Sequence, residues 1–373
     1  MRVAKAFLIG ILWCSVSLSA QSRYYGAIDL GSKGVKASLY SFVREAEGLD
    51  ARVLLKNTLN TKLMSSMNGE RFTPEGIQDA TEATRRLLKE MRDEAKKRRI
   101  AEVKYYIVGS SGVSKPENRD DLAASVKRAT GIDMEFINAR DEGYFGLSST
   151  IPRDSRSTSI YIDVGSGNTK LGCVIGGSEV SNFKSAEISY GSVSGRNAAA
   201  KRNSADIRAG IEQLMQDEVH SAYSKQSMDT PCLRNRQSVY WTGGAAWATA
   251  TLMHPEKALS AYVKITRTDL DTFLDRLSDG TWNQRKLTYN FPKGTSKKWE
   301  IDTRAKAEKE RNDVMDIFAT EDLLAGVSIM KTVLDAGNPS AVIRFARNGN
   351  YIYGYAIERY KEDRVLESRK GNH

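Results

Sequence analysis

Two segments of the chain place an aspartate at the end of an apolar run, directly before a turn of glycine and serine. Asp29 ends the run within residues 24–40, and Asp163 ends the run within residues 159–174. Glycine lets backbone N–H groups approach an anion closely, and a carboxylate at a strand end can hold hydrated Mg²⁺ against the same phosphate. We therefore predict Mg²⁺ as a cofactor, Asp29 and Asp163 as its ligands, and these phosphate-binding residues: Gly31, Ser32, Lys33, Gly165, Ser166, Gly167 and Asn168.

A third turn of similar chemistry lies further along the chain. An apolar strand predicted at 238–242 runs into Gly243 and Gly244, and a helix predicted at 245–253 follows. The first N–H groups of a helix have no intrahelical acceptor, so a glycine turn between a strand and a helix is a natural seat for an anion. We expect Gly243 and Gly244 to bind phosphate as well.

A candidate general base lies between the two aspartate turns. Asp141 and Glu142 occur in the segment 138–146, and taken alone they are typical of the acidic pair at the start of a helix. The position of this segment between the two turns favours a functional role for Glu142, because a carboxylate near a domain boundary can polarise water for in-line attack on phosphorus. The predicted catalytic residues are therefore Glu142, Asp29 and Asp163.

The elements that must position these residues indicate an α/β protein. Thr73 caps a helix that has Pro74 at its first position and an apolar stripe over 77–95. A strand is predicted at 103–108, helices at 118–129, 268–277 and 320–334, an irregular charged excursion at 286–308, and a closing strand with its tail at 343–357. Each aspartate turn opens a domain, so we predict domain I at 21–150, a connection at 151–157, and domain II at 158–373 with a C-terminal helical or strand extension.

Composition narrows the possible functions. The 373 residues are 40% hydrophobic and 27% charged, which is typical of a soluble globular protein. The three histidines and three cysteines form no metal-binding pattern, which argues against a zinc enzyme and a serine–histidine hydrolase. A net charge of +10 suits a polyanionic partner. Since the sequence contains no nucleic-acid-binding motif beside this positive charge, we expect no nucleic acid partner.

The N-terminus has the pattern of a secretory signal peptide at residues 1–20. Arg2 and Lys5 precede an apolar run over 6–16, and Ala20 is a small residue at the expected cleavage edge. An uncleaved apolar strand is the alternative, and a lipid anchor at Cys14 fits poorly after the bulky Trp13. No other stretch is a membrane-span candidate, so we predict a periplasmic or secreted protein. Export would let Cys173 and Cys232 pair, which the sequence leaves open.

Taken together, the motifs resemble the exopolyphosphatase / guanosine pentaphosphate phosphatase (Ppx/GppA) family from about residue 25 to residue 353. The resemblance is carried by the order and spacing of AIDLGSKGVKASLY, FTPEGIQDATEATRRLLKEM, IDVGSGNTK, YWTGGAAWATATL and EDLLAGVSIMKTVL. It implies two actin-like (RNase H-like) domains with the active site in an interdomain cleft. It also implies Mg²⁺-assisted hydrolysis of the terminal phosphate of polyphosphate or of a polyphosphorylated guanosine nucleotide. A homodimer is compatible with this resemblance, and the oligomeric state stays open.

The chain also departs from the family pattern. In the second loop, Ser166 stands for a glycine, Asn168 for the serine and Lys170 for a glutamate, while Ser114 stands where the family has arginine. Lysines 33, 36 and 170 either add positive charge near bound phosphate or point to the far faces of their strands. If they face the cleft, anion binding could survive while metal-assisted turnover falls.

Three functions therefore remain open at this stage. The first is an exported phosphohydrolase of the exopolyphosphatase type. The second is a nucleoside polyphosphatase resembling the apyrases, which the Glu-Gly-x-x-Gly pattern at 142–146 favours. The third is a non-catalytic protein that binds polyphosphate or a nucleotide, which rests on Lys170 and Ser114.

Overall fold

The computed structural model describes residues 22–31, 34–45, 48–64, 66–176, 180–284, 286–347 and 349–370. The predicted signal peptide at 1–20, with Cys14, lies outside the described residues, as do Ser32 and Lys33 of the first loop. Within the described residues, no helix combines the length and the apolar character that crossing a membrane requires.

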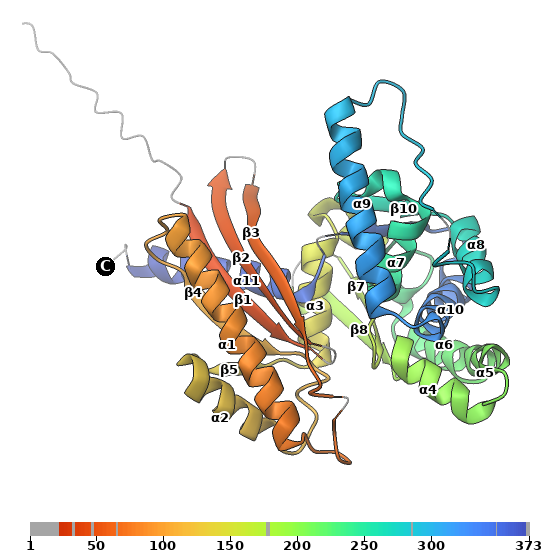
Figure 1. Cartoon of the computed structure of the whole chain (residues 1–373), viewed down its shortest axis with the longest axis horizontal. Coiled ribbons are helices and arrows are strands. Elements are labelled where there is room, and N and C mark those ends of the chain that lie inside the picture. Colours follow the sequence, from red (N-terminus) through yellow and green to blue (C-terminus); the bar gives the residue numbers. More distant parts are fainter. Residues whose placement is uncertain are drawn as a thin grey trace, which may run out of the picture.

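The first half of the chain forms a five-stranded sheet in the order β3-β2-β1-β4-β5 (Figure 1). Its strands are β1 (Arg23–Leu30), β2 (Gly34–Glu45), β3 (Gly48–Asn60), β4 (Lys104–Gly109) and β5 (Met134–Phe136). Helices α1 (Pro74–Lys97) and α2 (Arg119–Thr130) cover one face with their apolar side chains. The predicted cap of α1 is confirmed, because Thr73 Oγ1 accepts the Gly76 N–H at 3.1 Å.

The second half forms a six-stranded sheet in the order β10-β11-β9-β6-β7-β8. Its strands are β6 (Ser159–Val164), β7 (Thr169–Val174), β8 (Phe183–Ile188), β9 (Ser238–Gly243), β10 (Tyr262–Ile265) and β11 (Val342–Ala346). The helices that accompany it are α4 (Ser192–Arg202), α5 (Ile207–Leu214), α6 (His220–Asp229), α7 (Gly244–Met253), α8 (Arg267–Ser278), α9 (Lys297–Ile317) and α10 (Thr320–Gly337). A disulfide between Cys173 of β7 and Cys232 ties this sheet to the segment before β9. The predicted α/β class is confirmed.

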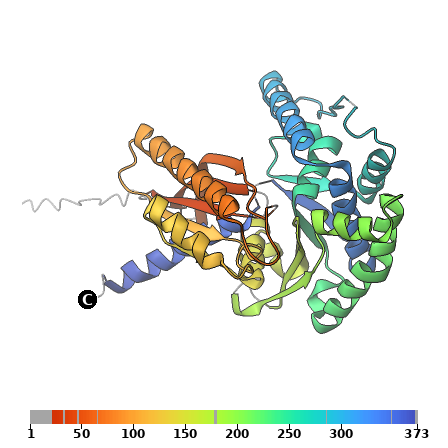
Figure 2. The ribbon, with the colours of Figure 1, turned by 60° about the horizontal axis from the view of Figure 1, so that its bottom comes forward.

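Two helices connect the halves: α3 (Ala139–Thr150) lies between the two sheets, and α11 (Tyr351–Lys370) runs along the first sheet toward the C-terminus (Figures 1 and 2). Helix α3 packs its apolar residues on the second sheet, although it precedes that sheet in the chain. Helix α11 returns to the first sheet, where Ile352, Tyr355 and Tyr360 pack against Tyr25 and other residues of β1 and β2. Each half of the chain therefore contributes one helix to the core of the other.

Two predicted segments differ from the structure. Residues 297–308 were expected to be irregular, but they begin the long helix α9, because Ser296 Oγ accepts the Trp299 N–H at 3.3 Å and caps it. The expected strand and tail at 343–357 become strand β11 over 342–346 and helix α11 from residue 351. Helix is favoured there because Ile352, Ala356 and Tyr360 recur at helical spacing and bury one face on the first sheet.

Candidate functional site

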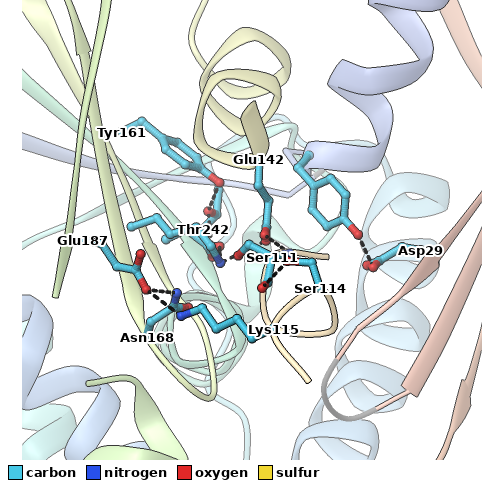
Figure 3. A network of polar contacts seen from close by, with 12 residues as sticks. Asp29, Ser111, Ser114, Lys115, Glu142, Tyr161, Asn168, Glu187 and Thr242 are labelled. Carbon is cyan, nitrogen blue, oxygen red and sulfur yellow. Dashed lines mark hydrogen bonds and ion pairs between the residues drawn. The ribbon is translucent and has the colours of Figure 1, made fainter. Parts of the chain in front are cut away.

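The candidate site lies where the strands carrying the two aspartates end. Asp29 is near the carboxyl end of β1, and Asp163 is at the corresponding place in β6. Helix α3 carries Glu142, which lies between Thr242 at the end of β9 and Asp29 in Figure 3. The side chain of Asn138 begins this helix, because its Oδ1 accepts the Asp141 N–H at 2.8 Å.

Lys170 is the centre of this arrangement. Its Nζ lies 2.9 Å from Glu142 Oε1 and 3.7 Å from Asp163 Oδ2, and the Lys170 and Glu142 side chains are only 9% and 6% exposed. Burial opposes the charge of Lys170, but attraction to Glu142 and Asp163 outweighs it and raises the pKa of Lys170. Burial likewise opposes the charge of Glu142, but Lys170 and hydrogen bonds from Ser111 outweigh it and lower the pKa of Glu142. Both groups are therefore charged at neutral pH.

The turn after β4 holds the second oxygen of Glu142. The Ser111 N–H donates to Glu142 Oε2 at 2.9 Å. The turn itself is held at the end of the first sheet by the Ser110 N–H, which donates to the Leu30 carbonyl at 3.1 Å. Ser114 closes the turn, because its hydroxyl donates to the Ser111 carbonyl at 2.8 Å. Glu142 is thus fixed between a lysine of one sheet and a backbone N–H of the other.

Asp29 is buried and has contacts from both ends of the chain. The Tyr351 hydroxyl at the start of α11 donates to Asp29 Oδ1, and Lys36 Nζ lies 3.7 Å from Oδ2. Burial raises the pKa of Asp29, although Lys36 and the Tyr351 hydroxyl favour its charged form. Burial, together with the negative charges of Asp29, Glu142 and Asp163, raises the pKa of Tyr351 and keeps its hydroxyl a donor. All three predicted carboxylates therefore belong to one electrostatic site.

Both lysines face the site because of the same hairpin register. Lys36 lies directly across from Asp29 in the β1–β2 pair, and Lys170 lies directly across from Asp163 in the β6–β7 pair. Residues opposite each other in a sheet point to the same face. The spacing of seven residues between each aspartate and its lysine is the sequence signal that could have resolved which way these two lysines point.

The second glycine loop is held in place by helix α4. The N–H groups of Ser192 and Val193 donate to the carbonyls of Gly165 and Ser166 at 2.8 and 3.0 Å. A Cβ at Gly191 would lie 2.3 Å from the Gly165 oxygen, so glycine is required for this close approach. Within the described residues, the N–H groups of Ser166 and Gly167 donate to no acceptor, which leaves them available to an anion.

The other predicted phosphate-binding residues that the structure describes lie in the turn after β9 or in the two loops that follow β1 and β6. Gly243 has a φ of 98°, which favours glycine, and a Cβ there would lie 2.3 Å from the Val164 oxygen and 3.1 Å from Asp163 Oδ1. A Cβ at Gly244 would meet the ring of Phe318 at 2.5 Å, so this glycine serves helix packing. The amide of Asn168 donates to Glu187 Oε1 at 2.6 Å. In the first loop, the Gly31 N–H donates to the Gly34 carbonyl at 2.9 Å.

Sequence reasoning missed the residues that hold the carboxylates from other elements. Thr242 Oγ1 lies 3.2 Å from Asp163 Oδ1 and 3.1 Å from the Tyr161 hydroxyl, at the end of β9. Ser111 and Tyr351 were missed as well. Tyr351 is 322 residues from Asp29 in the chain, and nothing local in the sequence indicates their contact.

The carboxylates around Lys170 do not fit a magnesium ion that would bridge them. The ammonium group of Lys170 already lies between Glu142 and Asp163, where such an ion would need oxygen ligands. Across the described ranges, no group of three or more histidine, cysteine, aspartate or glutamate residues is arranged to hold a metal ion. Magnesium therefore stays a prediction.

Solved structures of low sequence identity have the same fold over nearly the whole chain. A Ppx/GppA family member from Aquifex aeolicus is 14% identical, with a TM-score of 0.64 over 92% of this chain and 99% of that one. An exopolyphosphatase from Cytophaga hutchinsonii is also 14% identical, with a TM-score of 0.60 over 89% and 96%. An exopolyphosphatase-like protein is 16% identical, with a TM-score of 0.62 over 91% and 98%. These matches confirm the predicted two-domain, actin-like architecture.

The sequence itself identifies the family. The model of the Ppx/GppA phosphatase family matches residues 42–288, and this chain belongs to that family. No curated protein sequence matches the chain. The predicted resemblance is therefore confirmed at the level of the family.

Proposed function

We propose that this protein is a phosphohydrolase that removes the terminal phosphate from inorganic polyphosphate or from a polyphosphorylated guanosine nucleotide. Family membership supports hydrolysis of phosphoric anhydrides in general. The observation that carries the proposal is the junction of the two sheets, where Glu142 pairs with Lys170 and a Cβ at Gly165 of the second loop would lie 4.0 Å from Lys170 Nζ. Family membership also favours this reading over a nucleoside polyphosphatase of the apyrase type.

The proposed reaction needs a base, an anion seat and positive charge. The oxygen of water attacks the terminal phosphorus, and the proton that water loses passes to Glu142. The phosphorus–oxygen bond to the next phosphate breaks, and the leaving phosphate departs with the bonding electron pair. The N–H groups of Ser166 and Gly167 and the ammonium group of Lys170 stabilise the negative charge of the transferred group.

One contact favours a second candidate, a protein that binds phosphate chains without hydrolysing them. Lys170 Nζ lies 2.9 Å from Glu142 Oε1, and the Ser111 N–H occupies Oε2. Burial raises the pKa of Glu142, but these contacts outweigh burial and lower it, which makes Glu142 a weaker base. The same positive charge would still attract phosphate, so binding and turnover can be separated.

An assay of phosphate release distinguishes the two candidates. The purified protein is incubated with pyrophosphate, long-chain polyphosphate, guanosine polyphosphates and ATP, with Mg²⁺ and with chelator, and binding is followed by calorimetry. Phosphate release that Glu142→Gln abolishes and Asp141→Asn retains supports the hydrolase, because Asp141 is the neighbouring, partly exposed carboxylate of the same helix. Binding without release supports the second candidate, and neither binding nor release contradicts both. The chelator arm tests the magnesium prediction.

We propose further that the protein is exported to the periplasm or the medium. The disulfide between Cys173 and Cys232 supports this, because disulfides persist in oxidising compartments and are rare in the cytosol. Cell fractionation followed by N-terminal sequencing tests it. We expect a mature chain that begins after residue 20, and a full-length cytosolic protein would contradict the proposal.

A further inference from the structure

The two carboxylates beside Lys170 already have partners that the chain itself supplies. Lys170 Nζ lies 2.9 Å from Glu142 Oε1 and 3.7 Å from Asp163 Oδ2. The Ser111 N–H donates to Glu142 Oε2 at 2.9 Å. The other oxygen of Asp163, Oδ1, lies 3.2 Å from Thr242 Oγ1. Because a directly bound Mg²⁺ needs octahedral oxygen ligands at about 2.0–2.1 Å, it would have to displace the ammonium group from this position.

Asp29, on the first sheet, has partners of the same kind. Lys36 Nζ lies 3.7 Å from its Oδ2, and the Tyr351 hydroxyl donates to its Oδ1. Lys36 lies opposite Asp29 in the β1–β2 pair, just as Lys170 lies opposite Asp163 in the β6–β7 pair. Each of the two predicted metal ligands therefore faces a lysine of its own hairpin.

These two lysines balance most of the negative charge of the site. Three carboxylates face the two ammonium groups of Lys36 and Lys170, so the five side chains together have a formal charge of −1. A glutamate in place of Lys170 would make that charge more negative by two units, which is the charge that one Mg²⁺ supplies. Lysine at this position therefore has the same effect on the net charge as a glutamate together with one Mg²⁺.

Lys170 is also close enough to the second glycine loop to contact a ligand there. A Cβ at Gly165 of that loop would lie 4.0 Å from Lys170 Nζ. An ammonium group has three N–H donors, and the carboxylates of Glu142 and Asp163 can accept from two of them. One donor is then left for a phosphate oxygen. Because the Lys170 side chain is only 9% exposed, it has little freedom to move away from this position.

We propose that Lys170 takes the place of a divalent cation in this site, so that the preferred ligand is the metal-free anion of pyrophosphate or polyphosphate rather than its magnesium complex. This inference rests on the proposed function, and it names the ionic form of that substrate. Mg²⁺ bound to the anion would cancel part of the negative charge that attracts Lys170 and would bring a second cation close to it. Magnesium should therefore leave binding unchanged or weaken it.

Titration calorimetry with pyrophosphate, first in chelator and then in excess Mg²⁺, tests the inference on the wild type. We expect the affinity in chelator to equal or exceed the affinity in Mg²⁺. The variant is Lys170→Glu, and its control is Lys96→Glu on α1, which makes the same charge change at an exposed position. In chelator, Lys170→Glu should bind pyrophosphate about tenfold more weakly or worse, the ratio expected for the loss of one charge-assisted hydrogen bond. The control should bind as the wild type does.

Thermal melts with MgCl₂ and no phosphate ligand give a second measurement, which does not depend on turnover. Lys170→Glu places a third carboxylate beside Glu142 and Asp163, so millimolar Mg²⁺ should bind this variant and raise its melting temperature. The melting temperatures of the wild type and of Lys96→Glu should not respond to Mg²⁺. If Lys170→Glu does not fold, the calorimetry and the melts of the wild type still decide.

The outcomes separate this inference from the function on which it rests. Tighter pyrophosphate binding by the wild type in Mg²⁺ than in chelator would overturn the inference and support the magnesium prediction, while leaving the proposed function intact. Equal pyrophosphate affinities of Lys170→Glu and Lys96→Glu in chelator would also overturn it. So would a wild-type melting temperature that rises with Mg²⁺ as much as that of Lys170→Glu. A wild type that binds pyrophosphate under neither condition and releases no phosphate would contradict the proposed function itself.

Discussion

Replacing Lys170 by methionine tests the central ion pair, because methionine keeps the length of the side chain and removes its charge. At an effective dielectric constant of about 20, the attraction across the 2.9 Å between Lys170 and Glu142 is worth about 6 kcal/mol. Desolvation of both charges offsets part of this gain, and removing one partner of a buried pair typically costs about 3–5 kcal/mol. We expect Lys170→Met to lower the free energy of unfolding by that amount, about 3–5 kcal/mol, at neutral pH.

The pH dependence of this loss has a definite sign. The folded state lowers the pKa of Glu142, against the opposing effect of burial. Its stabilising contribution is therefore complete above the unfolded glutamate pKa of about 4.3, and is lost as pH falls through the lower folded value. The gap in stability between the wild type and Lys170→Met should then narrow as pH falls through this range.

Denaturant unfolding followed by circular dichroism at several pH values measures both effects. Lys96→Met on α1 is the control for loss of one positive charge at an exposed position. The double variant Lys170→Met with Glu142→Gln should cost less than the two single losses added together, since the pair is removed as a unit. If Lys170→Met costs no more than Lys96→Met at neutral pH, the buried ion pair is not made and the reasoning fails.

Three other substitutions test separate parts of the structure. Gly191→Ala puts a Cβ 2.3 Å from the Gly165 oxygen. We expect it to lower the free energy of unfolding by about 1–3 kcal/mol and to weaken pyrophosphate binding measured by calorimetry. Unchanged binding would contradict the role of the second glycine loop. Tyr351→Phe removes the hydroxyl that donates to Asp29; chemical denaturation should show a loss of about 1.5–3 kcal/mol, and a neutral effect would mean that the contact is absent. The Glu256 carboxylate 3.7 Å from Nδ1 and the Asp269 carboxylate 3.0 Å from Nε2 raise the pKa of His254 against the effect of burial, so its stabilisation is complete below the unfolded pKa of about 6.5 and is lost as pH rises through the folded value. Above about pH 6.5, the melting temperature of His254→Gln should therefore fall less steeply with rising pH than that of the wild type. Equal slopes for the two proteins would refute this.

Local patterns in the sequence predicted the parts of the protein that depend on few neighbouring residues. The aspartate turns lie at the ends of β1 and β6, the cap of α1 is at Thr73, and the strand–glycine–helix turn is at Gly243. Caps, turns and hairpins are decided by residues within a few positions of one another, so their signals survive in a single sequence. Where the pattern was weak, as in the charged segment 286–308, a long helix that begins at Lys297 was missed.

Tertiary structure alone decided which side chains surround the carboxylates. Tyr351 reaches Asp29 because α11 buries an aromatic face on the first sheet, and Ser111 reaches Glu142 because α3 packs between the sheets. The pairing of Cys173 with Cys232 depends in the same way on how β7 lies beside the segment before β9. Contacts between residues so far apart in the chain follow from the burial of whole faces, which no short stretch of sequence specifies. The amino-acid sequence therefore determined the chemical groups of the site, whereas the packing of two distant helices determined their charges and partners.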